Sequence, residues 1–206
     1  MKLGKRKCKQ CGETFQKVAP LQFLCGYSCK RDYEAEKERK AEEKAWKERK
    51  KVYEWNTTTL PQWKKRLEKE INLMVRRIDY GNTCMMCDKE IKKVNACHYH
   101  GVGSNDSLRF NLFNIWAGCY SCNGNKGGNI IGYDMMLIQK AGKDNWEYIK
   151  FQLVKDYPLL KLSREEVRDL IPKVHKLAIG VEAVRRSTME RWLLREKLNK
   201  QIGLYK

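Results

Sequence analysis

The sequence has little that would place it in a membrane or among secreted, disulfide-bonded proteins. Its start, MKLGKRKCKQCG, contains no apolar stretch of the kind found in a signal peptide, and no later apolar run is long enough to span a bilayer. We therefore expect no membrane association and a reducing, cytoplasmic location. In such a compartment, the four closely spaced pairs among the nine cysteines indicate metal ligands rather than disulfide bridges, which leaves Cys97 as the odd thiol.

Acidic side chains are also in short supply. The 206 residues include 25 aspartates and glutamates against 43 lysines and arginines, which gives a formal charge of +18. The electrostatic field of so basic a protein favours a polyphosphate partner, and we expect that partner to be DNA. Hydrophobic residues make up 42% of the chain, which is enough for small modules joined by helices rather than for one large core.

Four cysteines near the N-terminus form two closely spaced pairs, Cys8 with Cys11 and Cys25 with Cys29. This spacing predicts one structural zinc site in a module that spans residues 1–30. The segment has too few apolar residues to fold alone, so metal binding would supply on the order of 10 kcal/mol of its folding free energy. The sequence leaves open whether this module contacts DNA or only caps the chain.

The next two stretches are expected to be helices. Residues 30–55 lack glycine and proline, which predicts a long exposed helix within a charged spacer at 31–58. A second helix should begin after Thr59, with Gln62 completing its cap, and run to about Asp79. Its apolar residues recur every three or four positions and predict the buried face, namely Trp63, Leu67, Ile71, Met74 and Ile78.

Further helices are expected in the last third of the chain. Residues 131–141 should form one, and Asp144 should cap another that runs to about Lys155. Ser163 opens a third helix as part of a capping box, and Pro172 should kink or divide that helix. We expect the basic region at 156–206 to pack as helices with a basic outer face, the alternative being a clamp on the DNA backbone. The basic side chains of its tail are Arg185, Arg186, Arg191, Arg195, Lys197 and Lys200.

The centre of the chain carries a second set of paired cysteines. Cys84 and Cys87 form one pair, and Cys119 and Cys122 form the other. Only a fold that brings the two pairs together places four thiolates around one zinc ion, so we expect a closed structural site. Four protein ligands leave no position for water, and any catalytic metal must therefore lie elsewhere.

Residues around these cysteines match a nuclease pattern. His98 lies between the two pairs, Asn114 precedes the second pair by five residues, and Asn123 and Lys126 follow it. The arrangement H…N-x4-C-x2-C-[HN]-x2-K resembles that of the HNH, or ββα-metal, endonucleases. The chain also resembles the NinG (Rap) recombination proteins of lambdoid phages over nearly its whole length. The features that carry this resemblance are the N-terminal cysteines, the charged helix and the strings HY, LRF and CNxxKxGN.

The resemblance implies a function and the residues that carry it. It implies a structure-directed, resolvase-like endonuclease that acts on branched DNA such as Holliday junctions and D-loops, in the cytoplasm of the phage's bacterial host. His98, with an unperturbed pKa near ~6.5, would be the general base that deprotonates water. Asn114 would orient the strand and ring of His98. Asn123 would help to hold one hydrated Mg²⁺ or Mn²⁺, and Lys126 would contact phosphate.

One position departs from the nuclease pattern. Many ββα-metal enzymes have Asp or His directly before the base, whereas Cys97 stands here, and a soft thiol suits Mg²⁺ poorly. His100 is a candidate for the missing metal ligand, for a donor to phosphate, or for the base in place of His98. Cys97 would then be a small buried residue.

The sequence thus predicts an α+β, mostly helical chain, with a helix and a zinc-stabilised HNH-like core at 59–155, an N-terminal zinc knuckle and flanking long helices. We expect a structure-specific DNA endonuclease with two structural zinc ions and a catalytic Mg²⁺ or Mn²⁺. The alternatives are a non-catalytic zinc-dependent protein that binds branched or single-stranded DNA, and a zinc protein that binds RNA or the ribosome. A homodimer and recombination-protein partners are hypotheses, and the sequence does not determine the cleavage position or sequence preference.

Overall fold

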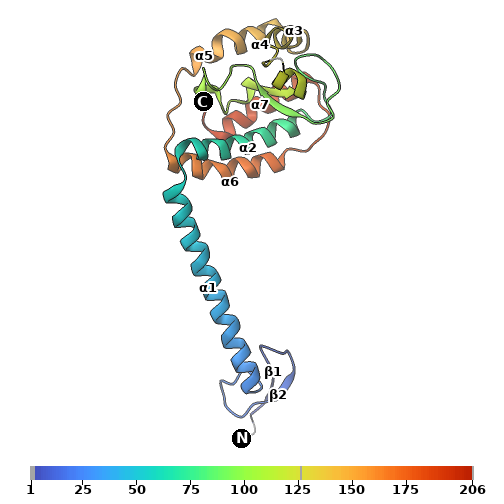
Figure 1. Ribbon diagram of the computed structural model, residues 1–206. Helices are drawn as coiled ribbons and strands as arrows, with labels where there is room; N and C mark the ends of the chain where they lie inside the picture. The colour runs from blue at the N-terminus through green and yellow to red at the C-terminus, as the bar shows by residue number, and fades with distance from the viewer. Residues whose placement is uncertain (1–2, 126, 206) are drawn as a thin grey trace. The chain divides into compact units, whose positions relative to one another are not determined.

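The computed structural model describes residues 3–125 and 127–205, and the chain divides after Thr58 into two compact units (Figure 1). The described residues are mostly helical, with one small antiparallel sheet in each unit. This confirms the expected mostly helical α+β class. Within the described parts of the chain, no helix has both the length and the apolar character that crossing a bilayer requires.

The first unit combines a short hairpin with a long helix. Strand β1 (Lys5–Lys7) pairs antiparallel with β2 (Thr14–Gln16), and helix α1 runs over Tyr27–Thr57 (Figure 1). None of the residues of α1 is buried. Ion pairs of 2.6 Å join Glu36 to Lys40 and Glu43 to Lys47, in the favourable i,i+4 orientation. The expected exposed, charged helix is therefore confirmed.

The second unit is built on two helices that lie side by side, α2 (Leu60–Ile78) and α6 (Arg164–Gly180) (Figure 1). Both begin with the predicted capping boxes, Thr59 with Gln62 and Ser163 with Glu166, which satisfy backbone N–H groups of the first turn. The buried residues of α2 are Trp63, Leu67, Ile71, Met74, Val75 and Ile78, so the periodicity identified the correct face.

Proline does not divide α6, in contrast to one of the two outcomes expected for it. Pro172 lies inside a helix that is continuous to Gly180, and its side chain is exposed. The missing N–H costs one helical hydrogen bond. Burial of Val167 and Val174 against the rest of the unit holds the helix on both sides of the proline, because tertiary packing supplies most of a helix's stability.

The segment after Gly142 is less regular than expected. Helix α3 (Ile130–Ala141) ends at Gly142, which has a φ of +91° and is also the cap of α4 (Lys143–Glu147). Asp144 is therefore not the cap but lies in the first turn, where a carboxylate is favoured by the helix dipole. The single helix expected to run to Lys155 is three segments, α4, the π-helical turn η4 (Tyr148–Gln152) and α5 (Leu153–Asp156).

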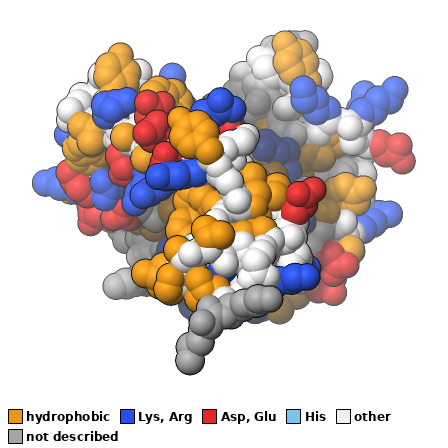
Figure 2. Space-filling view, turned by 90° about the horizontal axis from the view of Figure 1, so that it is seen from below, with side chains coloured by type: hydrophobic (Ala, Val, Ile, Leu, Met, Phe, Trp, Pro, Cys, Tyr) orange, Lys and Arg blue, Asp and Glu red, His pale blue; other side chains and the backbone are white. Residues whose placement is uncertain are grey.

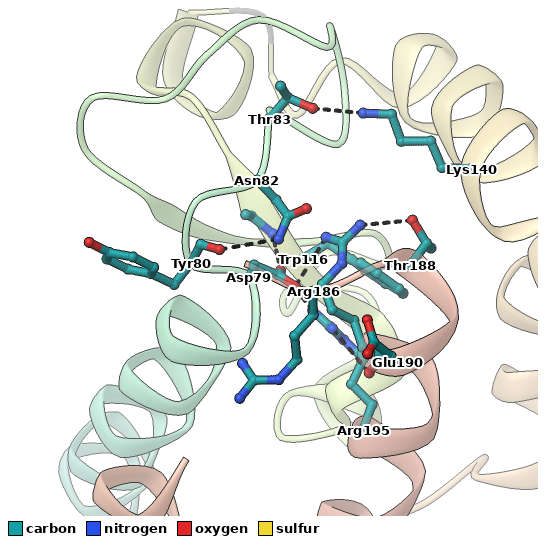
Figure 3. A network of polar contacts seen from close by, with 12 residues as sticks. Asp79, Tyr80, Asn82, Thr83, Trp116, Lys140, Arg186, Thr188, Glu190 and Arg195 are labelled. Atoms are coloured by element: carbon teal, nitrogen blue, oxygen red, sulfur yellow. Dashed lines mark hydrogen bonds and ion pairs between the residues drawn. The ribbon is translucent and has the colours of Figure 1, made fainter. Parts of the chain in front are cut away.

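Two arginines of the basic tail are buried rather than exposed. Helix α7 (Thr188–Ile202) places Arg195 Nη2 at 2.7 Å from Asp79 Oδ2 and Arg191 Nη1 at 3.3 Å from Asp79 Oδ1. The same carboxylate accepts the backbone N–H of Ala117, and the Arg195 guanidinium lies 3.7 Å from the centre of the Trp116 ring (Figure 3). The expectation of a basic outer face is therefore wrong for Arg191 and Arg195. Both pair with the buried carboxylate of Asp79, and Arg195 also donates to the carbonyl oxygens of Leu112 and Ile115.

Candidate active site

A two-stranded hairpin carries the predicted histidine. Strand β3 (Asn95–His98) pairs antiparallel with β4 (Ile115–Gly118), with Asn95 opposite Gly118 and His98 opposite Ile115. All four residues of β4 are buried, so the hairpin is anchored in the core by its second strand. His98 lies at the end of the ladder opposite to the one that leads into Cys119.

The central cysteines form a group at the other end of this hairpin. The sulfur atoms of Cys84, Cys87, Cys119 and Cys122 all lie within 4.8 Å of one another. Backbone N–H groups donate to two of them, from Cys119 to Cys84 Sγ at 3.3 Å and from Cys122 to Cys119 Sγ at 3.5 Å. Such donors stabilise thiolate charge, and four thiolates at this separation suit tetrahedral zinc.

The N-terminal cysteines form a second group of the same kind. Cys8, Cys11, Cys25 and Cys29 offer sulfur atoms that also lie within 4.8 Å of one another. Both predicted sets of four cysteines are thus brought together, and each could bind one zinc ion.

The ring of His98 is oriented by the backbone rather than by another side chain. Its Nε2 lies 2.9 Å from the carbonyl oxygen of Arg109, and because a carbonyl only accepts, Nε2 carries the proton. In the neutral ring, Nδ1 therefore keeps its lone pair. Burial lowers the pKa of His98 below its ordinary value of 6.5, and this effect outweighs the Arg109 carbonyl and the charge of Glu68, which raise the pKa. His98 is therefore neutral at pH 7.

Two carboxylates hold Arg109 in place. Its Nη1 donates to Glu68 Oε2 on α2 at 3.0 Å, and its Nε donates to Asp106 Oδ1 at 2.7 Å. The carbonyl that receives the His98 N–H thus belongs to a residue fixed by two ion pairs. The sequence pattern included Arg109 only as part of LRF and gave it no role.

Asn114 lies against the chain just beyond His98 and not against the His98 ring. Its Oδ1 accepts the backbone N–H of His100 at 2.7 Å, while its Nδ2 donates to the carbonyl oxygens of His100 at 3.1 Å and Leu108 at 3.2 Å. Asn114 is buried on the short 3-10 turn η2 (Leu112–Asn114). It therefore fixes the course of the segment that carries both histidines.

Asn123 lies on a turn directly after the central cysteines. The turn is a π-helical segment, η3 (Ser121–Asn125), and α3 begins only at Ile130, so Asn123 does not lie at the start of an α-helix. The Asn123 side chain is exposed. Within the described residues, no hydrogen bond links the side chains of His98, Asn114 and Asn123. The predicted phosphate contact, Lys126, lies outside the described residues.

The two other candidate residues near His98, Cys97 and His100, differ in their surroundings. Cys97 is 1% exposed, and a Cβ added at Gly118 on the facing strand would overlap its sulfur. Burial raises the pKa of Cys97 to about 12, so it is a packed neutral thiol. His100 Nε2 donates to the carbonyl of Ile149 at 2.7 Å, which leaves His100 Nδ1 as its acceptor nitrogen.

Asp134, a residue of α3 that the sequence analysis did not identify, stabilises the segment that carries His98 and His100. Asp134 accepts hydrogen bonds from the hydroxyl of Tyr99, from Trp146 Nε1 at 2.7 Å and from Lys150 Nζ at 2.8 Å. Tyr99 lies between the two histidines, so Asp134 ties their strand to α3, α4 and η4. An acidic residue on an amphipathic helix carries no local signal for this role.

The comparisons with known proteins confirm the resemblance to the NinG family. The family model described as "Bacteriophage Lambda NinG protein" matches residues 1–181. The chain is 28% identical to "Protein ninG" of Salmonella phage P22 over 158 residues, which cover 68% of this chain and 78% of the relative. It is also 28% identical to "Protein ninG" of Escherichia phage lambda over 160 residues, or 69% and 78% of the two chains. No solved structure matches. Because the family model covers most of its length, the chain belongs to the NinG family.

Proposed function

We propose that this protein is a metal-dependent endonuclease of the HNH, ββα-metal type that hydrolyses phosphodiester bonds in branched DNA such as Holliday junctions and D-loops. The observation that carries the proposal is the hydrogen bond between His98 Nε2 and the Arg109 carbonyl, which leaves a neutral imidazole with its Nδ1 lone pair unshared. The choice of branched substrates rests on the resemblance to recombination proteins, and the charge of +18 supports a nucleic-acid substrate.

His98 would act as the general base. Its Nδ1 takes a proton from a water molecule, and the resulting hydroxide oxygen forms a bond to phosphorus as the bond to the leaving sugar oxygen breaks. The positively charged ring that results keeps its Nε2–H on the Arg109 carbonyl, so that ring orientation is maintained through the step. A positioned base of this kind contributes roughly 10²–10⁴-fold to the rate.

A hydrated divalent ion would need few protein ligands, and Asn123 is the candidate ligand next to the hairpin. Asn123 offers an exposed amide oxygen, of the hard type that Mg²⁺ prefers, and the buried thiol of Cys97 offers none. Apart from the two cysteine groups, the described residues contain no set of three or more His, Cys, Asp or Glu side chains arranged to hold a metal. When bound, Mg²⁺ or Mn²⁺ would supply positive charge beside the phosphate and the leaving oxygen.

The rest of the machinery positions His98. Asn114 fixes the backbone of His100, Asp134 holds Tyr99, and the four central cysteines would close the other end of the hairpin around zinc. The hairpin of β3 and β4 followed by η3 and α3 would correspond to the two strands and helix of a ββα-metal core. We further propose that the protein acts as a homodimer, because symmetric resolution of a junction needs two cuts, and alongside other recombination proteins.

Cleavage of a labelled four-way junction, compared with a linear duplex of matched sequence, tests the function. Reactions contain Mg²⁺, Mn²⁺ or no added divalent ion and use the wild type, His98→Ala and His175→Ala. His175 is the matched control, because it is exposed on α6 and pairs with Glu70 outside the candidate site. We expect metal-dependent cutting of the junction that is lost in His98→Ala, with junction binding retained, and kept in His175→Ala.

The second candidate function is non-catalytic binding of branched or single-stranded DNA. The strongly basic composition and the two cysteine groups would serve this function equally well. If wild type and His98→Ala bind the junction with equal affinity and neither cuts it with any metal, the endonuclease proposal is wrong and the binding function replaces it.

A further inference from the structure

The N-terminal unit has an exposed apolar surface that the proposed cleavage chemistry does not use. A hollow of about 520 Å³ is lined by Leu21, Phe23, Leu24, Tyr27 and Tyr33, together with polar residues of the loop and of α1. Leu21 is 87% exposed and Tyr27 is 83% exposed. Figure 2 shows hydrophobic side chains gathered on one face of the molecule, with both basic and acidic side chains around them. Large apolar side chains at such exposure indicate a binding surface.

One side of the hollow is held rigid by its own contacts. The rings of Phe23 and Tyr33 pack edge to face with their centres 5.5 Å apart. Lys9 Nζ lies 5.5 Å from the Tyr33 ring centre and 6.0 Å from that of Phe23, and it also donates to the Tyr33 hydroxyl at 3.4 Å. Among the described residues, by contrast, Tyr27 has no aromatic neighbour and no hydrogen bond to its hydroxyl. The Tyr27 ring is therefore an uncovered flat surface beside the packed rings of Phe23 and Tyr33.

Most of the charged side chains around the hollow are positive. Lys30 and Lys37 line it, Lys9 lies on its aromatic wall, and Glu34 is the acidic residue of the lining. Residues 1–30 contain seven lysines and arginines against one acidic residue, Glu13. Apolar rings next to lysines match a polymer in which flat bases alternate with phosphates.

We propose that this hollow, named here the Tyr27 surface and formed by Leu21, Phe23, Tyr27 and Tyr33, binds an unpaired DNA strand by stacking a base on Tyr27. Lys30 and Lys37 would contact the flanking phosphates. A protein partner fits less well, because the rim supplies charge of mainly one sign around a small aromatic surface. The inference rests on the proposed function only for the source of the strand, which is the unpaired segment of a branched substrate.

Binding of a fluorescein-labelled 20-nucleotide oligodeoxythymidine to the full chain tests the proposal. Anisotropy is measured without Mg²⁺ or Mn²⁺, so that a failure of the nuclease proposal does not affect the result. We expect Tyr27→Ala to weaken binding by roughly 5- to 150-fold, the effect of losing one stacked base, and Tyr27→Phe to retain it. Leu21→Ala should also weaken binding, while affinity for a 20-base-pair duplex should change less than twofold in all three variants.

Tyr53→Ala is the matched control. Tyr53 is another exposed tyrosine of α1, at 70% exposure, and it does not line the hollow. Its replacement should leave oligodeoxythymidine binding unchanged. Equal affinity of wild type, Tyr27→Ala and Leu21→Ala for the oligonucleotide would overturn the proposal and assign the surface to another kind of partner. An equal loss of duplex and single-strand affinity would overturn it as well, because stacking requires unpaired bases.

Discussion

The side chain of Asn114 bonds to both backbone groups of His100, accepting from its N–H at 2.7 Å and donating to its C=O at 3.1 Å. This double contact mimics the pairing of one more residue in the sheet, beyond the point where the ladder of β3 and β4 ends at His98. The course of the chain directly after the candidate base is thus fixed by one buried amide.

Replacement of Asn114 by alanine should therefore lower both stability and activity. The change removes three hydrogen bonds, two from the partly buried backbone of His100 and one from the buried carbonyl of Leu108, which should reduce the free energy of unfolding by about 2–4 kcal/mol. Urea denaturation followed by circular dichroism measures the loss. Asn105→Ala is the control and should cost less than about 1 kcal/mol, because among the described residues the Asn105 side chain bonds only to Ser104. Similar midpoints for the two variants would contradict the role given to Asn114.

The buried pair of Asp79 and Arg195 offers a sharper stability test. Arg195→Ala removes the closer of the two guanidinium groups that pair with Asp79 and leaves only Arg191, at 3.3 Å, and the Ala117 N–H on that buried carboxylate. Breaking a buried ion pair costs about 3–5 kcal/mol. Lys200→Ala on the same helix breaks an exposed pair with Glu196 and should cost less than about 1 kcal/mol. Thermal unfolding of the two variants should separate them clearly. If Arg195→Ala unfolds at the wild-type temperature, the ion pair between Asp79 and Arg195 does not stabilise the fold.

The zinc content of the protein should be two ions per chain. Cys122→Ala should reduce the content to one, and loss of that ion should unfold the central site, because the four thiolates supply its cross-link. Cys97→Ala is the matched control, since Cys97 is a buried thiol outside both groups, and it should keep two ions. Inductively coupled plasma mass spectrometry of the purified variants gives the counts. A loss of zinc in Cys97→Ala would mean that the odd cysteine is a ligand after all.

Asp134 should make stability depend on pH in the acid range. Burial raises the pKa of its carboxyl, but the hydrogen bonds from Lys150, Tyr99 and Trp146 outweigh burial and hold the pKa below 3.8. A carboxylate with a lowered pKa stabilises the fold above its unfolded value near ~3.9, and this contribution is lost as pH falls through the folded value. Asp134→Asn should thus be less stable than wild type by about 1.5–3 kcal/mol at pH 7.

The difference between wild type and Asp134→Asn should shrink as the pH falls below about 4, because protonation removes the charge that the variant lacks. Urea titrations of both proteins between neutral pH and about pH 3 measure it. A difference that stays constant over this range would show that the charge of Asp134 contributes nothing and that its hydrogen bonds alone matter.

The sequence by itself determined the features that depend on neighbouring residues. Cysteines three or four positions apart place two thiols in one turn, so both sets of four could be recognised without the fold. The capping boxes at Thr59 and Ser163 and the buried face of α2 follow from hydrogen bonds and periodicity within a single helix. These elements were predicted correctly because the interactions that define them span only a few positions.

Only the tertiary structure decided which groups meet across long separations. The carboxylate of Asp79 lies 116 residues from Arg195, and no local pattern distinguishes that arginine from an exposed one. The His98 ring is held by a carbonyl eleven residues away, and a backbone acceptor leaves no trace in residue identity. Whether a charge is buried, and how a ring is oriented, depends on the partner that the fold brings close to it. The sequence could therefore suggest His98 as the candidate base, whereas only the fold showed that the Arg109 carbonyl orients its ring.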